Sequence, residues 1–199
     1  ILMRHFKVNT LIGLGVEEFP TGILAAGALL QYLYDTQKTD LEHFTHISPY
    51  LTSKYMLLDS STRRNLELTE TLREKQKRGS LLWVLDKTKT AMGGRLLRNY
   101  IEQPLIDKEE MEKRLDAIQE LNQDSISRDE IREYLNPVYD LERLLSKVTY
   151  KTANPRDLIA FRNSLQMLPP IKTVLSGFQK EELAAIREEI DGLEDIYQL

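Results

Sequence analysis

A mainly helical fold is predicted for this chain, and three observations predict it. Glycine and proline are sparse, at 9 and 7 of 199 residues, which disfavours all-β folds with their many tight turns. Apolar residues recur at three- and four-residue spacing through most of the chain after residue 79. Helix-start signals, such as Asn-Pro pairs and single aspartates before an apolar stripe, recur along the same region. Within this multi-helix fold we expect one small β-hairpin and one short N-terminal strand.

The first elements lie before residue 37. Residues 6–12 have a strand-like pattern that ends at two glycines. Glu17-Glu18-Phe19-Pro20 places acidic groups and a proline where the first turn of a helix favours them, so we expect a helix to about Thr36. This helix is apolar nearly all round between Ile23 and Leu33, which predicts burial on several sides.

The hairpin is expected in the middle of the first half of the chain. Residues 45–51 and 54–58 are two short β-type runs with Thr52-Ser53 between them, and Pro49 confines the first run to an edge position. Asp59 follows as an N-cap, because its carboxylate can accept from the first N–H groups of a helix. That helix is expected to continue through Leu68.

The run from Gly79 to Leu97 predicts two short helices joined by a turn rich in threonine and glycine. The apolar residues expected in its core are Leu81, Leu82, Leu85, Met92, Leu96, Leu97 and Ile101. We expect the Gly93-Gly94 pair to allow close helix approach. The segment from Asp86 to Thr90 is expected to form the capped turn that sets the angle between the helices.

Only helices are expected in the rest of the chain. Asp107 is the predicted N-cap of a helix over 108–122, and the next helix opens at Asp124 or Ser127. Two Asn-Pro pairs then start one helix each, and Pro169-Pro170 ends the second of them. A final helix is expected from Lys180 to Gln198. The Asn-Pro pairs are Asn136-Pro137 and Asn154-Pro155.

Composition excludes several classes of site. With no cysteine, the chain can form neither a disulfide nor a thiolate metal site. No apolar run reaches the roughly 18 residues that span a bilayer, so no membrane partner is expected. The formal net charge is −4. This total hides a basic stretch over residues 54–98 and an acidic one over 107–145. The basic stretch can attract nucleic-acid phosphates, and the alternative is a solvated helix face.

No catalytic constellation emerges from the residues. His43 and His46 lie near Asp40 and Glu42, but in a segment predicted to be loop and strand, where surface histidines are the default. No phosphate-binding loop of the G-x-x-x-x-G-K-[ST] type is present. We therefore expect no catalytic, cofactor or metal residues.

Two polar clusters could still carry a role. Asp59, Arg63, Arg64 and Glu67 form a charged cluster, in which Arg63 and Glu67 can pair across one helical turn. Its functional interpretation is a latch or phosphate contact, and its structural interpretation is a capped helix docked through an ion pair.

The second cluster lies in the threonine- and glycine-rich turn. Thr88, Thr90, Gly93 and Gly94 could bind an anion at a helix N-terminus or form a plain capped turn. Both interpretations remain open from the sequence.

Several long motifs occur in one order, and together they resemble the bacterial MutS family of mismatch-repair proteins over nearly the whole chain. The motifs are Ala25–Leu33 with Thr36-Gln37-Lys38, Asp59–Leu68, Gly79–Leu105, Asp140–Leu144 and Ala153–Leu158. The resemblance implies that residues 1–16 are the end of the family's connector domain. Residues 17–199 would be its helical core domain with the start of the lever. Its structural signature here comprises Asp59, Arg63, Arg64, Glu67, Asp86, Thr90, Gly93, Gly94 and Arg95.

The resemblance also implies a role and partners. The segment would couple the ATPase state of a longer protein to mismatched-DNA binding, without catalysis of its own. ATP or ADP with Mg would bind in an ATPase domain outside this chain. Mismatched double-stranded DNA, a MutL-type protein and a second copy of the parent would be partners, in the bacterial cytoplasm near the nucleoid. The start without methionine and the stop at Leu199 suggest an excised fragment. The alternative function is a stand-alone helical module for protein–protein interaction through an exposed apolar patch.

Overall fold

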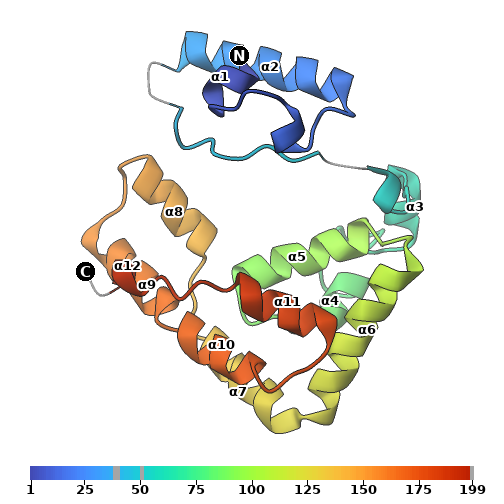
Figure 1. The fold of residues 1–199 in the computed structure, drawn as a ribbon. Coiled ribbons are helices and arrows are strands. Elements are labelled where there is room, and N and C mark those ends of the chain that lie inside the picture. The colour runs from blue at the N-terminus through green and yellow to red at the C-terminus, as the bar shows by residue number, and fades with distance from the viewer. Residues whose placement is uncertain (38–40, 50–51, 198–199) are drawn as a thin grey trace. The chain divides into compact units, whose positions relative to one another are not determined.

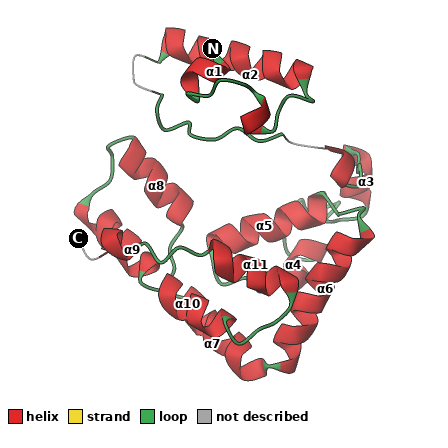
Figure 2. Ribbon diagram, viewed as in Figure 1, coloured by secondary structure: helices red, strands yellow, loops and turns green. Residues whose placement is uncertain are grey.

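The computed structural model describes residues 1–37, 41–49 and 52–197, and its ribbon consists of helices and loops (Figures 1 and 2). The chain forms two compact units, Ile1–Thr52 and Ser53–Leu199. Among the described residues, no helix is long and apolar enough to span a bilayer. The mainly helical prediction is confirmed, and the β-hairpin prediction is wrong.

The first unit contains α1 (Leu2–His5), the 3₁₀ helix η1 (Ile12–Leu14) and α2 (Pro20–Thr36). Its core consists of Leu2, Leu30 and Leu41. No strand forms over residues 6–12, where the sequence predicts one. The N–H of Phe6 donates to Leu2 O at 2.9 Å at the end of α1, turns follow, and residues 12–14 form η1.

Helix α2 begins at Pro20, so Glu17 and Glu18 precede it and its first turn holds no acidic residue, contrary to the prediction. It is also buried on one side only. Leu30 is buried, whereas Leu24 and Leu29 are 74% and 60% exposed. The first unit is too small to surround a 17-residue helix.

The predicted hairpin fails because its second run finds another partner. Residues 45–49 form no strand, and residues 50 and 51 lie outside the described residues. The expected turn residues begin the 3₁₀ helix η2 (Thr52–Lys54). Tyr55 then forms an isolated antiparallel bridge with Leu105, and the N–H of Met56 donates to Pro104 O at 2.8 Å. An isolated two-stranded hairpin is marginally stable in water, so pairing with a chain segment next to a packed helix is favoured.

The second unit begins with α3 (Ser60–Asn65), α4 (Leu81–Leu85) and α5 (Ala91–Glu102). Leu68, Leu82 and Ile101 form the core of this region, with Leu58 and Leu97 packed against it. Several residues expected in this core are exposed instead, among them Leu81, Leu85 and Leu96. Each short helix therefore buries one narrow face.

Helix α3 ends at Asn65 and not at Leu68. Glu67 has a left-handed backbone, with φ of 48°. The N–H of Glu67 donates to Arg64 O at 3.1 Å and that of Leu68 to Arg63 O at 3.3 Å. These are the two hydrogen bonds of a Schellman C-cap, which terminates a helix even without glycine.

The main core lies between α6 (Lys108–Gln123), α7 (Ser125–Leu135), α10 (Leu168–Leu175) and α11 (Glu181–Glu189) (Figure 1). Its buried residues are Ala117, Ile171, Leu175, Phe178 and Leu183. Two further helices, α8 (Leu141–Thr149) and α9 (Pro155–Leu165), pack against each other, and α12 (Glu194–Tyr197) packs against α9.

Three further helix boundaries differ from the prediction. Asn136 ends α7, and Asp140 caps α8 in place of the expected start at Pro137. Pro169 and Pro170 lie in the first turn of α10 rather than after a helix, because a first turn does not need their missing N–H groups. The expected last helix divides into α11 and α12 at Leu193, whose φ is 48°.

Candidate functional site: the polar joints of the helical core

The nine signature residues lie in the second unit, near the ends of α3, α4 and α5. At the first of these places the Asp59 carboxylate accepts from the Thr62 N–H at 2.6 Å and caps α3. This hydrogen bond is the main cause that lowers the pKa of Asp59. Asp59 therefore acts as the N-cap that the sequence predicts.

The expected ion pair between Arg63 and Glu67 does not form at the end of α3. Arg63 Nε donates to Leu58 O at 2.9 Å, and the Glu67 carboxylate accepts from the Leu72 N–H at 2.6 Å. The pair fails because Glu67 lies beyond the helix end in a left-handed conformation, so the two residues do not share a helix face. Arg64 is exposed and forms no ion pair with any described residue.

The N-terminus of α4 is closed by four hydrogen bonds. Glu67 O and Leu68 O accept from the N–H groups of Leu81 and Leu82 at 3.0 and 2.9 Å. The Ser80 N–H donates to Lys77 O at 3.1 Å, and Ser80 Oγ accepts from the Trp83 N–H at 3.2 Å. All four N–H groups that a helix start leaves open thus have partners, and none remains for an anion.

The turn between α4 and α5 is built on one carboxylate. Asp86 accepts from Lys77 Nζ and from the Thr88 hydroxyl, the latter at 2.7 Å. These donors, Lys77 first, lower the pKa of Asp86 to about 2. Thr90 is the N-cap of α5, because its Oγ1 accepts from the Gly93 N–H at 3.0 Å. Asp86 and Thr90 therefore form the capped turn.

The glycine pair fits against this turn. A Cβ on Gly93 would lie 3.1 Å from Thr90 Oγ1, and one on Gly94 would lie 3.4 Å from Thr88 Oγ1. The close approach is thus between the first turn of α5 and the loop that precedes it, and not between two helices as the sequence suggested. The pair keeps the capping hydroxyls close to the helix start.

Arg95 reaches another part of the unit. Its guanidinium donates two parallel hydrogen bonds to Asp140, at 2.7 and 2.8 Å, and one to Glu142 at 2.5 Å. Asp140 is also the N-cap of α8, where it accepts from the Arg143 N–H at 3.4 Å. The two carboxylates, Asp140 first, raise the pKa of Arg95, and Arg95 is the main cause that lowers the pKa of Asp140. These charged hydrogen bonds therefore connect the first half of α5 to the start of α8.

The Arg95–Asp140 contact spans 45 positions in the sequence. No periodicity relates residues so far apart, and the resemblance supplied only the two separate motifs that contain them. An aspartate that precedes an apolar stripe signals a cap, but it does not reveal which arginine binds the same carboxylate.

Similar joints connect other helices of the unit. Lys147 of α8 pairs with Asp157 at 2.8 Å, and Asp157 forms a reciprocal capping box with Asn154 at the start of α9. The Glu120 carboxylate of α6 accepts from the N–H groups of Gln179 and Lys180 at 2.9 and 3.0 Å. A polar side chain thus serves repeatedly as both a helix cap and a tie to another helix.

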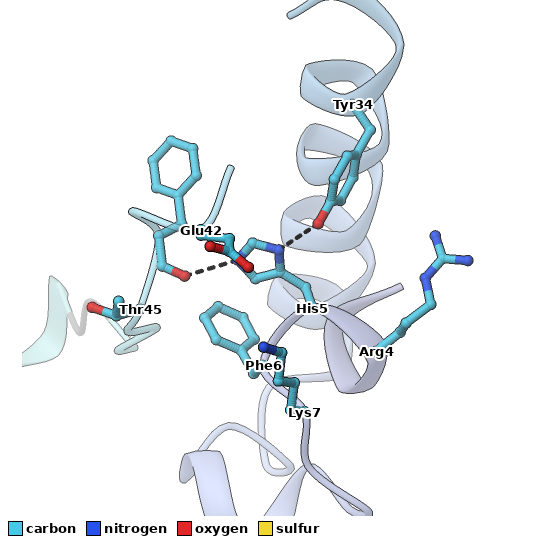
Figure 3. Close-up of a pocket in the computed structure, with 8 residues that line it drawn as sticks. Arg4, His5, Phe6, Lys7, Tyr34, Glu42 and Thr45 are labelled. Atoms are coloured by element: carbon cyan, nitrogen blue, oxygen red, sulfur yellow. Dashed lines mark hydrogen bonds between the residues drawn. The ribbon is translucent and has the colours of Figure 1, made fainter. Parts of the chain in front are cut away.

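In the first unit, His5 connects helix α2 to the loop that contains Phe44 (Figure 3). It lines a pocket of about 460 Å³ together with Arg4, Lys7 and Tyr34. Its Nε2 donates to Phe44 O at 2.8 Å, and its Nδ1 is hydrogen-bonded to Tyr34 Oη at 2.7 Å. Both ring nitrogens are thereby engaged.

No group of three metal-ligating side chains occurs within residues 1–37, 41–49 and 52–197. His43 lies against the Phe44 ring, with centroids 4.2 Å apart. Asp40, the neighbouring carboxylate considered from the sequence, lies outside the described residues.

The fold and the polar contacts at helix ends together define a class of protein, namely a helical scaffold in which polar residues connect helix ends to one another. Comparisons with known proteins specify it further. The family model described as MutS domain III matches residues 61–198, and the one described as MutS domain II matches residues 1–47. The chain is 64% identical over 198 residues to the DNA mismatch repair protein MutS of Lachnoclostridium phytofermentans, and 51% identical over 199 residues to that of Ruminiclostridium cellulolyticum.

Both alignments cover 100% of this chain, but only 21% and 22% of those relatives. The chain belongs to the MutS family of DNA mismatch repair proteins. It corresponds to the part of the family that carries domains II and III, and it spans about a fifth of the length of these relatives.

Proposed function

We propose that this chain is the transmission segment of a MutS protein, coupling the nucleotide state of an ATPase domain to the binding of mismatched DNA, with no catalysis of its own. The observation that carries the proposal is the bidentate contact between Arg95 and Asp140. It joins two helix starts that the chain connects only through α6 and α7, so a displacement of α5 acts directly on α8.

Transmission of a conformational change requires helices that move as rigid bodies and contacts between helices that can adopt two arrangements. Side-chain N-caps and bidentate ion pairs at helix ends suit this role. They hold orientation through a few strong directional contacts and can exchange partners without opening an apolar core. The Arg95 guanidinium, which binds both Asp140 and Glu142, already has two carboxylates between which it can divide its hydrogen bonds.

The remaining features of the parent are part of the same proposal. The end of the connector domain would come first, and the core with the start of the lever would follow. The domain II match to residues 1–47 and the domain III match to residues 61–198 support a boundary after residue 47 rather than after the expected residue 16. The parent would bind mismatched double-stranded DNA as a homodimer, hydrolyse ATP with Mg in another domain, engage a MutL-type protein and work in the bacterial cytoplasm. What supports these points is family membership alone.

The experiment uses the full-length parent protein and compares Arg95→Gln with Arg98→Gln. Arg98 pairs with Glu102 at 3.0 Å within α5, so its variant removes an ion pair without touching a joint between helices. We expect Arg95→Gln to slow the ATP-induced release of a mismatched duplex by about tenfold, which corresponds to ~1.4 kcal/mol. Basal ATP hydrolysis should be retained, and Arg98→Gln should behave as the parent. Equal behaviour of the two variants would refute the coupling role of this joint.

A second experiment separates the transmission segment from the alternative, a stand-alone interaction module. If the chain is a transmission segment, the isolated chain should show weak, salt-sensitive binding to duplex DNA with no preference for a mismatch. A fluorescence-anisotropy titration of the 199-residue chain with matched and mismatched duplexes at two salt concentrations measures this. A clear preference for the mismatch contradicts the proposal, and capture of a protein partner by this chain alone supports the module.

A further inference from the structure

We infer that α4 and the loops on either side of it form a docking surface for an acidic amphipathic helix of a partner protein. The loops are residues 71–79, before α4, and residues 86–90, after it. An exposed apolar stripe on α4 and the charges beside it support this surface, which is independent of the coupling role proposed above.

Helix α4 buries only one of its five residues, Leu82. Among the other four, Leu81, Val84 and Leu85 are 43%, 56% and 49% exposed. Their i, i+3, i+4 spacing places them on one face of the helix, and this is the pattern through which one helix packs against another. This face of α4 is therefore apolar and open to water.

The apolar surface continues beyond α4 around Glu67. Its carbonyl accepts from the Leu81 N–H at 3.0 Å, and its carboxylate accepts from the Leu72 N–H at 2.6 Å. Leu72 is exposed, and so is Leu66, which precedes Glu67 in the chain. Trp83 adds an exposed indole on α4 itself. Exposed apolar residues that gather in one place in this way are typical of protein contact sites.

The charges beside this surface are predominantly positive. Residues 71–90 contain six basic and two acidic side chains. One of the two carboxylates, that of Asp86, is neutralised by its ion pair with Lys77. By contrast, α6, which carries the exposed Leu115 and Ile118, contains five acidic and three basic residues. The charge next to an exposed apolar face therefore differs between α4 and α6.

Hydrogen bonds within the two loops hold the surface in a defined shape. In the first loop, the Thr71 N–H donates to Gln76 O at 2.9 Å. The ion pair between Lys77 and Asp86 connects this loop to the second, where Asp86 accepts from the Thr88 N–H at 3.2 Å. A preformed surface loses less conformational entropy when a partner binds, so these contacts favour docking.

An apolar stripe with cations beside it fits a helix whose own apolar stripe is bordered by glutamate or aspartate. The apolar residues exclude water from the centre of such a contact, and opposite charges at its rim fix the orientation. Nucleic acid supplies negative charge but no apolar helix face to cover Leu81, Val84 and Leu85. A second copy docked through the same face would bring the cations of residues 71–90 against one another. The chemistry therefore favours an acidic helix of another protein.

The test measures the binding of a designed peptide to the 199-residue chain. The peptide has about 16 residues, enough to form a helix, with leucines at i, i+3, i+4 and i+7 spacing and glutamates beside them. A second peptide has the same composition in an order that removes this spacing. Anisotropy of a labelled peptide gives the affinity. The emission of Trp83, the only tryptophan of the chain, should shift to shorter wavelength as the peptide displaces water.

The apolar stripe is tested by Val84→Ser, with Ile126→Ser as the matched control. Ile126 is also β-branched, and it is 81% exposed on α7. We expect Val84→Ser to weaken binding of the amphipathic peptide about fivefold, because two methyl groups leave the contact. Ile126→Ser should bind the peptide as the parent chain does. Circular dichroism confirms that both variants keep the helical content of the parent chain.

The charges are tested by two double substitutions. Lys87→Gln with Lys89→Gln removes two cations beside α4, and Lys151→Gln with Arg156→Gln removes two exposed cations elsewhere in the unit that form no ion pair with a described residue. The first variant should bind the peptide about threefold more weakly at about 50 mM salt and lose less at about 200 mM, because salt screens exposed charges. The second should leave the affinity unchanged.

Four outcomes would overturn the inference. The amphipathic peptide could fail to bind, or the reordered peptide could bind equally well, which would show that charge alone is recognised. Self-association of the free chain that Val84→Ser abolishes would assign the face to a second copy. Binding by the 199-residue chain but not by the full-length parent would show that another part of the parent covers α4. None of these outcomes affects the coupling proposal, whose test measures release of DNA from the full-length protein.

Discussion

At the residue scale, Asp86 shows how one carboxylate organises a turn. It accepts hydrogen bonds from Lys77 and Thr88, and its pKa is lowered to about 2. A carboxylate whose pKa is lower in the folded chain than in the unfolded chain contributes stability above its unfolded value of 3.8, and this contribution is lost as pH falls towards 2. Asp86 should therefore stabilise the chain at neutral pH.

The Asp86→Asn variant tests this contribution. We expect it to lower the free energy of unfolding by about 1 kcal/mol at pH 7, a value reduced for solvent screening because Lys77 is half exposed. The difference from the parent should shrink between pH 4 and pH 2. Urea unfolding followed by circular dichroism across that range measures it, with Asp195→Asn as the control at an exposed carboxylate. A difference that does not change with pH would contradict the assignment.

The two adjacent glycines of α5 allow a second residue-scale prediction. Alanine is favoured over glycine in a helix by up to about 1 kcal/mol. At Gly94 the new Cβ would meet Thr88 Oγ1 at 3.4 Å, an ordinary contact, so we expect Gly94→Ala to be stabilising.

At Gly93 the new Cβ would lie 3.1 Å from Thr90 Oγ1, the atom that caps the helix, so the cap must shift and offset the gain. Thermal melts should therefore rank Gly94→Ala above Gly93→Ala. The reverse order would show that the cap contributes little to the stability of this joint.

At the element scale, some helix ends were predictable from the sequence and others were not. Caps such as Asp59 and Asp107 were predictable because they act on N–H groups two or three residues away. The end of α3 was not, because Glu67 adopts a left-handed conformation that its residue type does not favour. The pairing of residue 55 with residue 105 was not predictable either, since short-range periodicity carries no information about distant partners.

Amphipathic stripes predict more burial than the fold provides. Leu115 and Ile118 share the apolar stripe of α6 with Leu121, yet they are 62% and 61% exposed, whereas the buried residue is Ala117, which lies beside Leu121. An apolar stripe wider than the face that the neighbours cover leaves part of itself in water. The sequence predicts which residues can be buried, and the packing of other elements decides which of them are.

The capping box at the start of α9 allows a prediction about the stability that a single helix cap contributes. Asn154 accepts from the Asp157 N–H at 3.0 Å, and the Asp157 carboxylate accepts from the Asn154 N–H at 3.0 Å. Asn154→Ala should lower the free energy of unfolding by about 1 kcal/mol, the usual cost of losing an N-cap. Denaturant unfolding measures the loss, and Asn154→Asp, which keeps a capping oxygen, should recover most of it. An alanine variant as stable as the parent would mean that Pro155 alone is enough to start the helix.

At the scale of the whole molecule, the candidate site was predictable in part. The positions of the signature residues at turns and caps followed from residue types, but the fork from Arg95 to Asp140 needed the fold. Two units with separate cores make up the chain. Among the described residues, the first unit has one cluster of three buried apolar residues, and the second has two clusters with eight buried residues between them. Stability should therefore be divided unequally between the units.

This inequality leads to the last prediction. A polypeptide of residues 53–199 should retain its helical circular dichroism and unfold cooperatively, with a midpoint within a few degrees of the corresponding transition in the 199-residue chain. A polypeptide of residues 1–52 should show no cooperative transition, because chains of this size bury too little apolar surface to offset the entropy of folding. Calorimetry of the two pieces and the parent chain makes the comparison. A large drop in the midpoint of residues 53–199 would show that the first unit stabilises the second, and signals between helices would then have a route beyond the joints of the second unit.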